Sequence, residues 1–403
     1  MHIAKEEGGL GGYRKFKLRA SVTDPSFIRE KMYYDVLGAA GLPASRASYV
    51  RLFVNNEPLG LYVMVDNYKN PFLKNTFGGS KATLGNKKNK YKHGVLYQGD
   101  IAENFTNPET PSANLAYRGP LASDYDVAMS TTINDMDATA NNSIAISSSS
   151  SSSSRTALYR IRQESSDPEE PPGLTRLIEF LEFIATHSTD EQEWEERFDV
   201  DMFLKNMAFE VVMGHVDGYL GAAHNYFLYY HPTTQKLVWM TADLDQTMGN
   251  SMFEEQKKNQ ALDRYGLLHH DRPLFQHIMQ IPTYKKQFNR ILKEIHKGLF
   301  TDDCLRDHVN YLTDLIKDDV AWDAKIRTVR SSAFDHDANA QKHRRQIQEK
   351  ILQLPLGSDL LARINMIDFH SALHGPIADH PSLMPLHDYI TQAKQALTHY
   401  IAS

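Results

Sequence analysis

Residues 215–250 read HVDGYLGAAHNYFLYYHPTTQKLVWMTADLDQTMGN. The apolar runs at 226–230 and 237–240 flank a short segment of turn-forming residues, and this pattern predicts a β-hairpin. Pairing of the two strands brings Asn225, which precedes the first strand, close to Asp243, which follows the second. The stretch therefore predicts polar side chains gathered at the open end of an apolar hairpin.

Two further aspartates belong to the same stretch. Asp217 lies on the loop before the hairpin, where it can face the same point, and Asp245 follows Asp243 by two residues. Carboxylate and amide oxygens are the ligands of hard cations, so Asp243 and Asn225 are candidate ligands of a magnesium-type ion. A single Asp at a loop end more often bonds to its own backbone, but three polar residues flanking one hairpin favour a site. Asp245 suits a second metal ligand and a cap of the following turn equally, and both interpretations stay open.

The order of these residues is that of protein kinases, in which a catalytic-loop Asp precedes a metal-binding Asn, a hairpin and a metal-binding Asp. The spacings are longer here, and Leu244-Asp245 stands where kinases have Phe-Gly. In the small lobe of kinases, a strand Lys pairs with a helix Glu and holds phosphates. Lys17 and Glu30 are candidates for that pair. Lys17 and Arg19 also suit one solvated strand face, and this alternative stays open.

The rest of the chain divides into a mixed first part and a mainly helical second part. Predicted strands cover residues 13–19, 48–54, 59–65 and 94–97, and a helix begins at Asp24-Pro25 and ends before Gly41. Predicted helices cover residues 174–184, 201–212, 273–281, 283–298, 302–321, about 334–353 and 383–401. A Ser-rich tract at about 119–155 has too little apolar surface to order itself, which predicts a flexible insertion. We expect an α+β chain with parts at 1–170 and 171–403, the second carrying the hairpin.

Composition excludes several classes of protein. The 403 residues carry a formal net charge of −6, so there is no global positive field to attract nucleic acid. The single cysteine, Cys304, excludes an internal disulfide and a cysteine-based zinc site. No run of roughly 18 or more apolar residues is present, so we expect no transmembrane segment. The first residues also lack the apolar region of a signal peptide, which we interpret as a shortened amino terminus.

Two separated motifs make the chain resemble the CotH family of spore-coat-type proteins. The first lies in residues 16–68, FKLRASVTDPSFIREKMYYDVLGAAGLPASRASYVRLFVNNEPLGLYVMVDNY, and includes Asp24-Pro25, Ile28-Arg29 and Gly41-Leu42-Pro43. The second consists of Asp217-Gly218-Tyr219, Asn225-Tyr226 and Asp243-Leu244-Asp245. The motifs occur in the family's order, and the resemblance covers most of residues 13–250. Length and style are similar to the Mucorales-like fungal branch.

The resemblance implies an atypical, bilobal protein-kinase-like fold with a small mixed strand and helix N-lobe and a mainly helical C-lobe. It implies Mg²⁺-dependent (or Mn²⁺-dependent) transfer of the ATP γ-phosphate to serines of spore-coat or cell-surface proteins. By motif, Asp217 would be catalytic and Asp243, Asn225 and Asp245 would bind the metal. Nucleotide-binding residues would be Lys17, Glu30, Arg29 and Asp66.

The family pattern also has departures and a second implied role. Thr241-Ala242 replaces the family's Pro-Trp, Asp66 replaces a Glu, and His224 replaces an Asn. The resemblance places the protein at a spore or cell surface, or among secreted proteins. The alternative function is a weakly active or inactive adhesin or invasin that binds a host-cell receptor.

Overall fold

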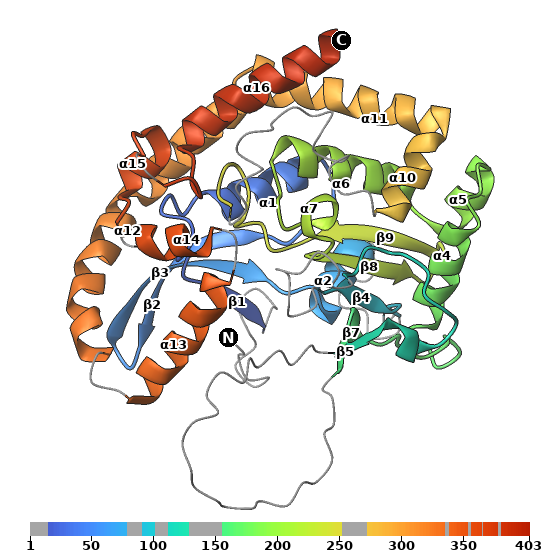
Figure 1. Cartoon of the computed structure of the whole chain (residues 1–403), viewed down its shortest axis with the longest axis horizontal. Coiled ribbons are helices and arrows are strands. Elements are labelled where there is room, and N and C mark those ends of the chain that lie inside the picture. Colours follow the sequence, from blue (N-terminus) through green and yellow to red (C-terminus); the bar gives the residue numbers. More distant parts are fainter. Residues whose placement is uncertain are drawn as a thin grey trace, which may run out of the picture.

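The computed structural model describes residues 15–78, 91–100, 112–128, 155–251, 272–334, 338–353, 356–364, 366–377 and 380–403. The fold is α+β, as expected, with two principal antiparallel sheets and helices packed around them (Figure 1). One continuous buried core includes side chains from both sheets and from most of the longer helices. No described helix combines the length and the apolar character needed to cross a lipid bilayer.

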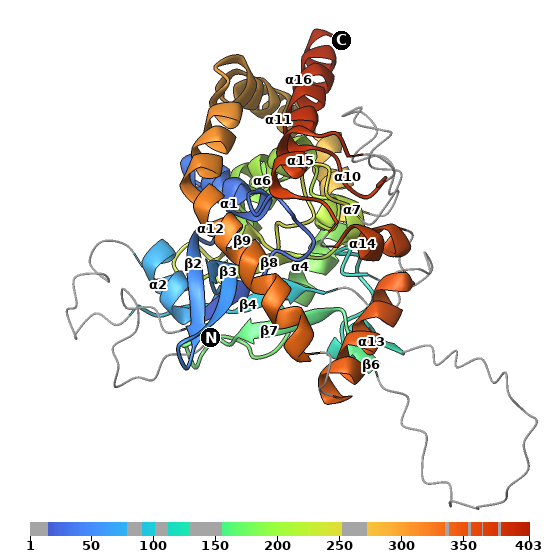
Figure 2. The same ribbon diagram turned by 90° about the vertical axis from the view of Figure 1, so that its left-hand side faces the viewer.

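The first sheet contains β1 (Phe16–Arg19), β3 (Glu57–Asp66) and β2 (Ala47–Val54), in that order and antiparallel. Asn55 and Asn56 form the turn between β2 and β3 with φ angles of 50° and 65°, a conformation that asparagine tolerates well. Helix α1 (Arg29–Ala39) packs against this sheet, and the long helix α12 (Cys304–Phe334) runs alongside β3 (Figure 2).

Helix α1 begins later than the sequence indicates. Asp24 and Pro25 do not open the helix, because Phe27 adopts a φ of 57° that interrupts helical geometry. The Asp24 carboxylate nevertheless accepts a hydrogen bond from the backbone N–H of Arg29, at 3.0 Å. Asp24 thus satisfies a first-turn donor from a loop rather than from the N-cap position.

The second sheet has the order β7-β4-β8-β9 and is antiparallel throughout. Its strands are β7 (Tyr159–Gln163), β4 (Leu96–Gly99), β8 (Tyr226–His231) and β9 (Lys236–Thr241). The predicted hairpin at 226–240 is confirmed as β8 and β9, and β4 pairs with β8 along its outer edge. This sheet joins strands from both sides of the boundary expected at residue 170.

A small two-stranded sheet closes the Ser-rich tract. It consists of β5 (Asp126–Ala128) and β6 (Arg155–Ala157), preceded by the short helix η2 (Ala122–Tyr125). The tract predicted to be flexible thus begins with regular structure at residues 122–128, and residues 129–154 lie outside the described part of the chain.

The remaining elements are helical. They are α2 (Asn70–Phe77), α4 (Thr175–Ala185), α5 (Glu191–Arg197), α6 (Val200–Val212), α7 (Tyr219–Ala222), α10 (Pro273–Gln280), α11 (Pro282–Ile295), the π-helix η3 (His296–Thr301), α13 (Ala338–Leu352), α14 (Gly357–Arg363), α15 (Phe369–His374) and α16 (Leu386–Ala402). Figure 1 shows α11 and α16 layered over α6 and α1, on the side away from the sheets. The predicted helices 174–184, 201–212, 273–281 and 383–401 are confirmed within a few residues.

Candidate functional site

The loop that carries Asp217 is fixed by the end of helix α6. Gly214 adopts a φ of 59°, and the N–H of His215 bonds back to the carbonyl of Glu210 at 2.9 Å, which ends the helix. The Nε2 of His215 then lies 3.1 Å from Oδ1 of Asp217. The same nitrogen lies 3.1 Å from the carbonyl oxygen of Asp243. The buried His215 side chain therefore connects Asp217 to the end of the hairpin.

The hairpin mouth brings the predicted residues together. Register pairs Tyr226 with Thr241, and the N–H of Ala242 donates to the carbonyl of Asn225 at 2.9 Å. Both Asn225 and Asp243 adopt left-handed backbone conformations, with φ of 58° and 59°. These turns redirect the chain out of the strands, and the amide Nδ2 of Asn225 donates to Oδ2 of Asp217 at 2.9 Å.

An aromatic base supports this end of the hairpin. The Trp239 side chain is fully buried and stacks on Tyr226, with ring centroids 4.4 Å apart and planes 17° apart. It also contacts Phe203 and Tyr219 at centroid distances of 5.1 Å. Such packing against three rings limits motion of the strands that position the polar groups.

Arg19, at the end of β1, is the central cation of the cluster. Its Nη2 lies 2.6 Å from Oδ1 of Asp243 and 2.9 Å from Oδ1 of Asp245. Its Nε lies 2.8 Å from Oε2 of Glu30, on helix α1. Lys17, two residues earlier on the same strand face, reaches to 4.0 Å from Oδ2 of Asp243. One guanidinium thus joins the first sheet, helix α1 and the turn after the hairpin.

The acids of the cluster have very different affinities for protons. Burial would raise the pKa of Asp243, but Arg19 and Lys17 outweigh burial and lower it to about 2. Burial raises the pKa of Asp245 to about 6, against the attraction of Arg19 and with the repulsion of Asp243. Burial likewise raises the pKa of Glu30 to about 8, although Arg19 opposes the shift.

The two histidines near Asp217 also have shifted pKa values. Burial alone would lower the pKa of His215, but the Asp217 carboxylate beside it outweighs burial and raises it. His224, whose Nε2 lies 3.9 Å from Oδ2 of Asp217, has a lowered pKa because its burial dominates. His215 is therefore the histidine better suited to carry a positive charge beside the Asp217 carboxylate.

The donor chemistry suits a hard divalent cation, whereas the arrangement holds an arginine. Oxygens of Asp243, Asp245 and Asn225 are ligands of the kind that Mg²⁺ binds. Arg19, however, bonds to both aspartates. Across the described ranges, no group of three or more His, Cys, Asp or Glu side chains is gathered closely enough to hold a metal ion. Binding of a cation by these residues thus stays a prediction, and it would require Arg19 to share or release the aspartates.

Three of the residues predicted to bind nucleotide, Glu30, Arg29 and Asp66, have contacts that differ from the expected ones. Glu30 pairs with Arg19 rather than with Lys17, so the expected Lys17–Glu30 pair is wrong. Arg29 is fully buried and donates to Asp24 Oδ1 at 2.6 Å, to the Met248 carbonyl at 3.2 Å and to the Met384 carbonyl at 2.7 Å. Its donors are used inside the protein, so the nucleotide assignment of Arg29 is corrected to a structural one.

Asp66 lies at the far end of β3, opposite Phe16. Its carboxylate accepts from the N–H of Asn67 at 2.8 Å, and no hydrogen bond or ion pair among the described residues joins it to Arg19. Burial raises the pKa of Asp66 to about 6. The structure therefore does not bring Asp66 into the cluster.

Two residues of the cluster, Arg19 and His215, are not among the site residues predicted from sequence. Arg19 shares its strand face with Lys17, and only the spacing between β1 and α1 decides which of the two meets Glu30. His215 carries a clearer signal, because His215-Val216-Asp217 matches the His-x-Asp order of kinase catalytic loops. A pattern search for that order would have found it.

Comparison with known proteins identifies a family and several relatives. The family described as CotH kinase protein matches residues 3–353. Spore coat protein homolog 1 of Rhizopus delemar is 25% identical over 318 residues, which are 77% of this chain and 43% of that protein. Invasin CotH3 of the same fungus is 26% identical over 325 residues, covering 79% of this chain and 46% of its own length.

A bacterial relative matches a shorter region. The inner spore coat protein H-like protein of Bacillus subtilis is 36% identical over 72 residues, covering 18% of this chain and 23% of that protein. The chain spans less than half the length of the two fungal relatives. Because the family match extends over nearly the whole chain and includes both motif regions, the protein belongs to the CotH kinase family.

Proposed function

We propose that this protein is an ATP-dependent phosphotransferase that modifies serines of coat or surface proteins. The observation that supports this most directly is the convergence of Asp217, Asn225 and Asp243 at one hairpin mouth, beside the Arg19–Glu30 ion pair. Protein kinases use the same order of groups for positioning and for charge stabilisation.

Asp217 has the position of a catalytic base. One of its oxygens faces His215 and the other accepts from Asn225, so the carboxylate is oriented before a substrate arrives. In the proposed reaction it positions the serine hydroxyl and accepts its proton. The serine oxygen bonds to the γ-phosphorus of ATP as the bond from that phosphorus to the bridging oxygen breaks and ADP leaves. His215, with its raised pKa, balances the Asp217 charge in the resting protein.

In the proposed site, Arg19 takes the role that a phosphate-holding lysine has in protein kinases. It is anchored by Glu30 from helix α1, and Lys17 lies on the same strand face. The two cations would bind nucleotide phosphates. Asp243, with Asn225 and Asp245, would hold Mg²⁺ or Mn²⁺, which supplies positive charge to the phosphate oxygens when bound.

Thermal stability in the presence of ATP and Mg²⁺ tests the proposal. Ligand at about 100 times its Kd stabilises the native state by ~2.7 kcal/mol, which is a readily measured rise in Tm. We expect this rise in the wild type and in the surface control Asp314→Ala, but not in Asp243→Ala. Phosphate transfer from labelled ATP to a serine-containing coat protein should follow the same order. An equal rise in Asp243→Ala would refute the assignment of the site.

A second function draws on the names of relatives. Rhizopus delemar proteins called invasins match most of this chain, and the chain covers less than half of each of them. A surface protein that binds a host-cell receptor would not need the Asp217 and Asp243 carboxylates. Adhesion of purified protein to host cells that persists in the Asp217→Asn and Asp243→Ala variants, without nucleotide binding by the wild type, would favour this function.

A further inference from the structure

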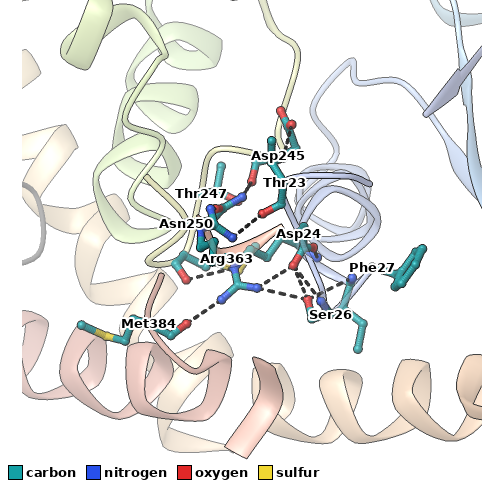
Figure 3. A network of polar contacts seen from close by, with 12 residues as sticks. Thr23, Asp24, Ser26, Phe27, Asp245, Thr247, Asn250, Arg363 and Met384 are labelled. Atoms are coloured by element: carbon teal, nitrogen blue, oxygen red, sulfur yellow. Dashed lines mark hydrogen bonds and ion pairs between the residues drawn. The ribbon is translucent and has the colours of Figure 1, made fainter. Parts of the chain in front are cut away.

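Arg363, the last residue of α14, is buried with 1% of its surface exposed. Its Nε donates to Ser382 Oγ at 2.7 Å, its Nη1 to the Thr23 carbonyl at 2.8 Å and its Nη2 to Asn250 Oδ1 at 2.5 Å (Figure 3). All three partners are neutral oxygens, and each comes from a different segment of the chain. A buried cation held this way is costly to desolvate, so its retention calls for a specific purpose.

Two of these partners lead directly to Asp245. The hydroxyl of Thr23 donates to Oδ2 of Asp245 at 3.0 Å. The amide Nδ2 of Asn250 donates to the Asp245 carbonyl at 2.8 Å. In Figure 3, Thr23 and Asn250 lie between Arg363 and Asp245. Arg363 is therefore connected through Thr23 to the side chain of Asp245 and through Asn250 to its backbone.

The carboxy-terminal segment provides the frame for this contact. Ser382 accepts from the N–H of Ser251 at 2.9 Å, and the N–H of Met384 donates to the carbonyl of Gly249 at 2.8 Å. The N–H of Ser382 in turn donates to Oδ2 of Asp359, on α14, at 2.7 Å. The family match ends at residue 353, so Asp359, Ser382 and Met384 lie beyond it.

We propose that Arg363 is a positioning residue for the Asp245 carboxylate, and that α14 and residues 382–384 thereby support the phosphotransfer site. The inference rests on the proposed function for its ligand. In this proposal Arg363 acts through Thr23 and Asn250. A lysine would fit the charge but not the three-way hydrogen bonding, because its single ammonium cannot span three separated acceptors.

The test compares Arg363→Lys with Leu373→Ala, a core truncation on α15 that leaves the Arg363 contacts in place. Both should lower the melting temperature. Only Arg363→Lys should raise the Mg²⁺ concentration that half-saturates the ATP-dependent stabilisation, by ~10–100-fold as for other groups that orient metal ligands. Equal half-saturation in wild type and Arg363→Lys overturns the proposal.

Thr23→Val gives a milder second variant, because it removes the hydroxyl that holds Asp245 Oδ2 and keeps the backbone carbonyl that Arg363 binds. We expect Thr23→Val also to raise the Mg²⁺ concentration that half-saturates the ATP-dependent stabilisation. Its effect and that of Arg363→Lys should sum to more than the effect of the double variant, since both act on one carboxylate. Strict additivity overturns the coupling.

Amide hydrogen exchange distinguishes failure of this inference from failure of the proposed function. Without any ligand, the peptide 243–251 should exchange faster in Arg363→Lys than in Leu373→Ala. If the wild type does not respond to ATP and Mg²⁺, the proposed function fails and this exchange result alone decides the role of Arg363. Unchanged exchange in peptide 243–251 refutes it.

Discussion

Replacing Arg19 by methionine tests the electrostatic centre of the site. The change keeps the apolar stem and removes the charge that lies 2.6–2.9 Å from Asp243, Asp245 and Glu30. Breaking a buried ion pair typically costs about 3–5 kcal/mol. Arg19 keeps 22% of its side chain exposed and Lys17 stays near Asp243, so we expect a smaller loss, about 2–3 kcal/mol at pH 8.

The loss should depend on pH in a defined direction. The pKa of Asp245 is about 6 and that of Glu30 about 8 with Arg19 present, and removing Arg19 raises both further. Near pH 5 both acids hold a proton, so little charge is left unpaired in Arg19→Met. As pH rises toward 8, both acids ionise in the unfolded chain, whereas in the folded variant they either keep their protons or ionise without Arg19. Both cases cost stability, so the variant loses stability relative to the wild type.

Urea unfolding followed by tryptophan fluorescence, at pH 5 and pH 8, measures both quantities. Arg51→Met is the matched control, because Arg51 pairs with Asp319 at the surface with 45% of its side chain exposed. That pair should contribute less than about 1 kcal/mol at either pH. Mg²⁺ at 10 mM should also stabilise Arg19→Met, by ~1.4 kcal/mol for a Kd of about 1 mM. This stabilisation should be larger than that of the wild type. A loss equal to that of Arg51→Met, or one independent of pH, would show that Arg19 does not hold these acids.

Four further changes test other parts of the site. Gly218→Ala puts a Cβ 2.7 Å from Nδ1 of His215 and should destabilise by about 1–3 kcal/mol in urea unfolding; a neutral result means the loop can shift. Glu30→Gln removes an acid with a pKa of about 8, so the wild type should lose stability relative to the variant from pH 5 to 8, by at most ~1.4 kcal/mol per pH unit. The opposite slope would mean that Arg19 outweighs burial. Arg29→Met should destabilise by about 3–5 kcal/mol while the folded protein keeps its ATP affinity, and a selective loss of affinity in calorimetry would restore the nucleotide role. Asp217→Asn should lower phosphotransfer ~10²–10⁴-fold and leave ATP binding unchanged; full activity excludes Asp217 as the base.

The sequence predicts the hairpin and the meeting of Asn225 with Asp243 because both depend on local pattern. Strand alternation and a short turn set the register, and register alone brings the strand ends together. The strand predicted at 94–97 lies at 96–99 in the structure, and the reason is a contact distant in sequence. Gly94 passes so close to the Tyr230 carbonyl that any Cβ would clash, so this position is a close backbone approach rather than a strand start.

The partner of Glu30 and the role of Arg29 depend on contacts across long stretches of chain. Lys17 and Arg19 are equivalent in alternation, and the packing of β1 beside α1 selects Arg19. Arg29 lies one residue before Glu30, yet its guanidinium bonds to carbonyls of Met248 and Met384. The role of Arg29 has no local signal, since its deciding partners lie more than 200 residues away.

The two aspartates of Asp243-Leu244-Asp245 differ in role, and the difference follows from their surroundings. Leu244 is fully buried and turns both flanking carboxylates toward Arg19. Asp243 faces two cations and keeps 31% of its side chain exposed, so it stays ionised and accessible. Asp245 is held by Thr23 through its carboxylate and by Asn250 through its carbonyl, and its pKa is raised. Neighbouring acids whose pKa values are pushed apart serve separate functions. Asp243 is therefore suited to meet a cation first. For Asp245, the role of a second metal ligand stays a prediction, and its carbonyl anchors the following turn by accepting from Asn250.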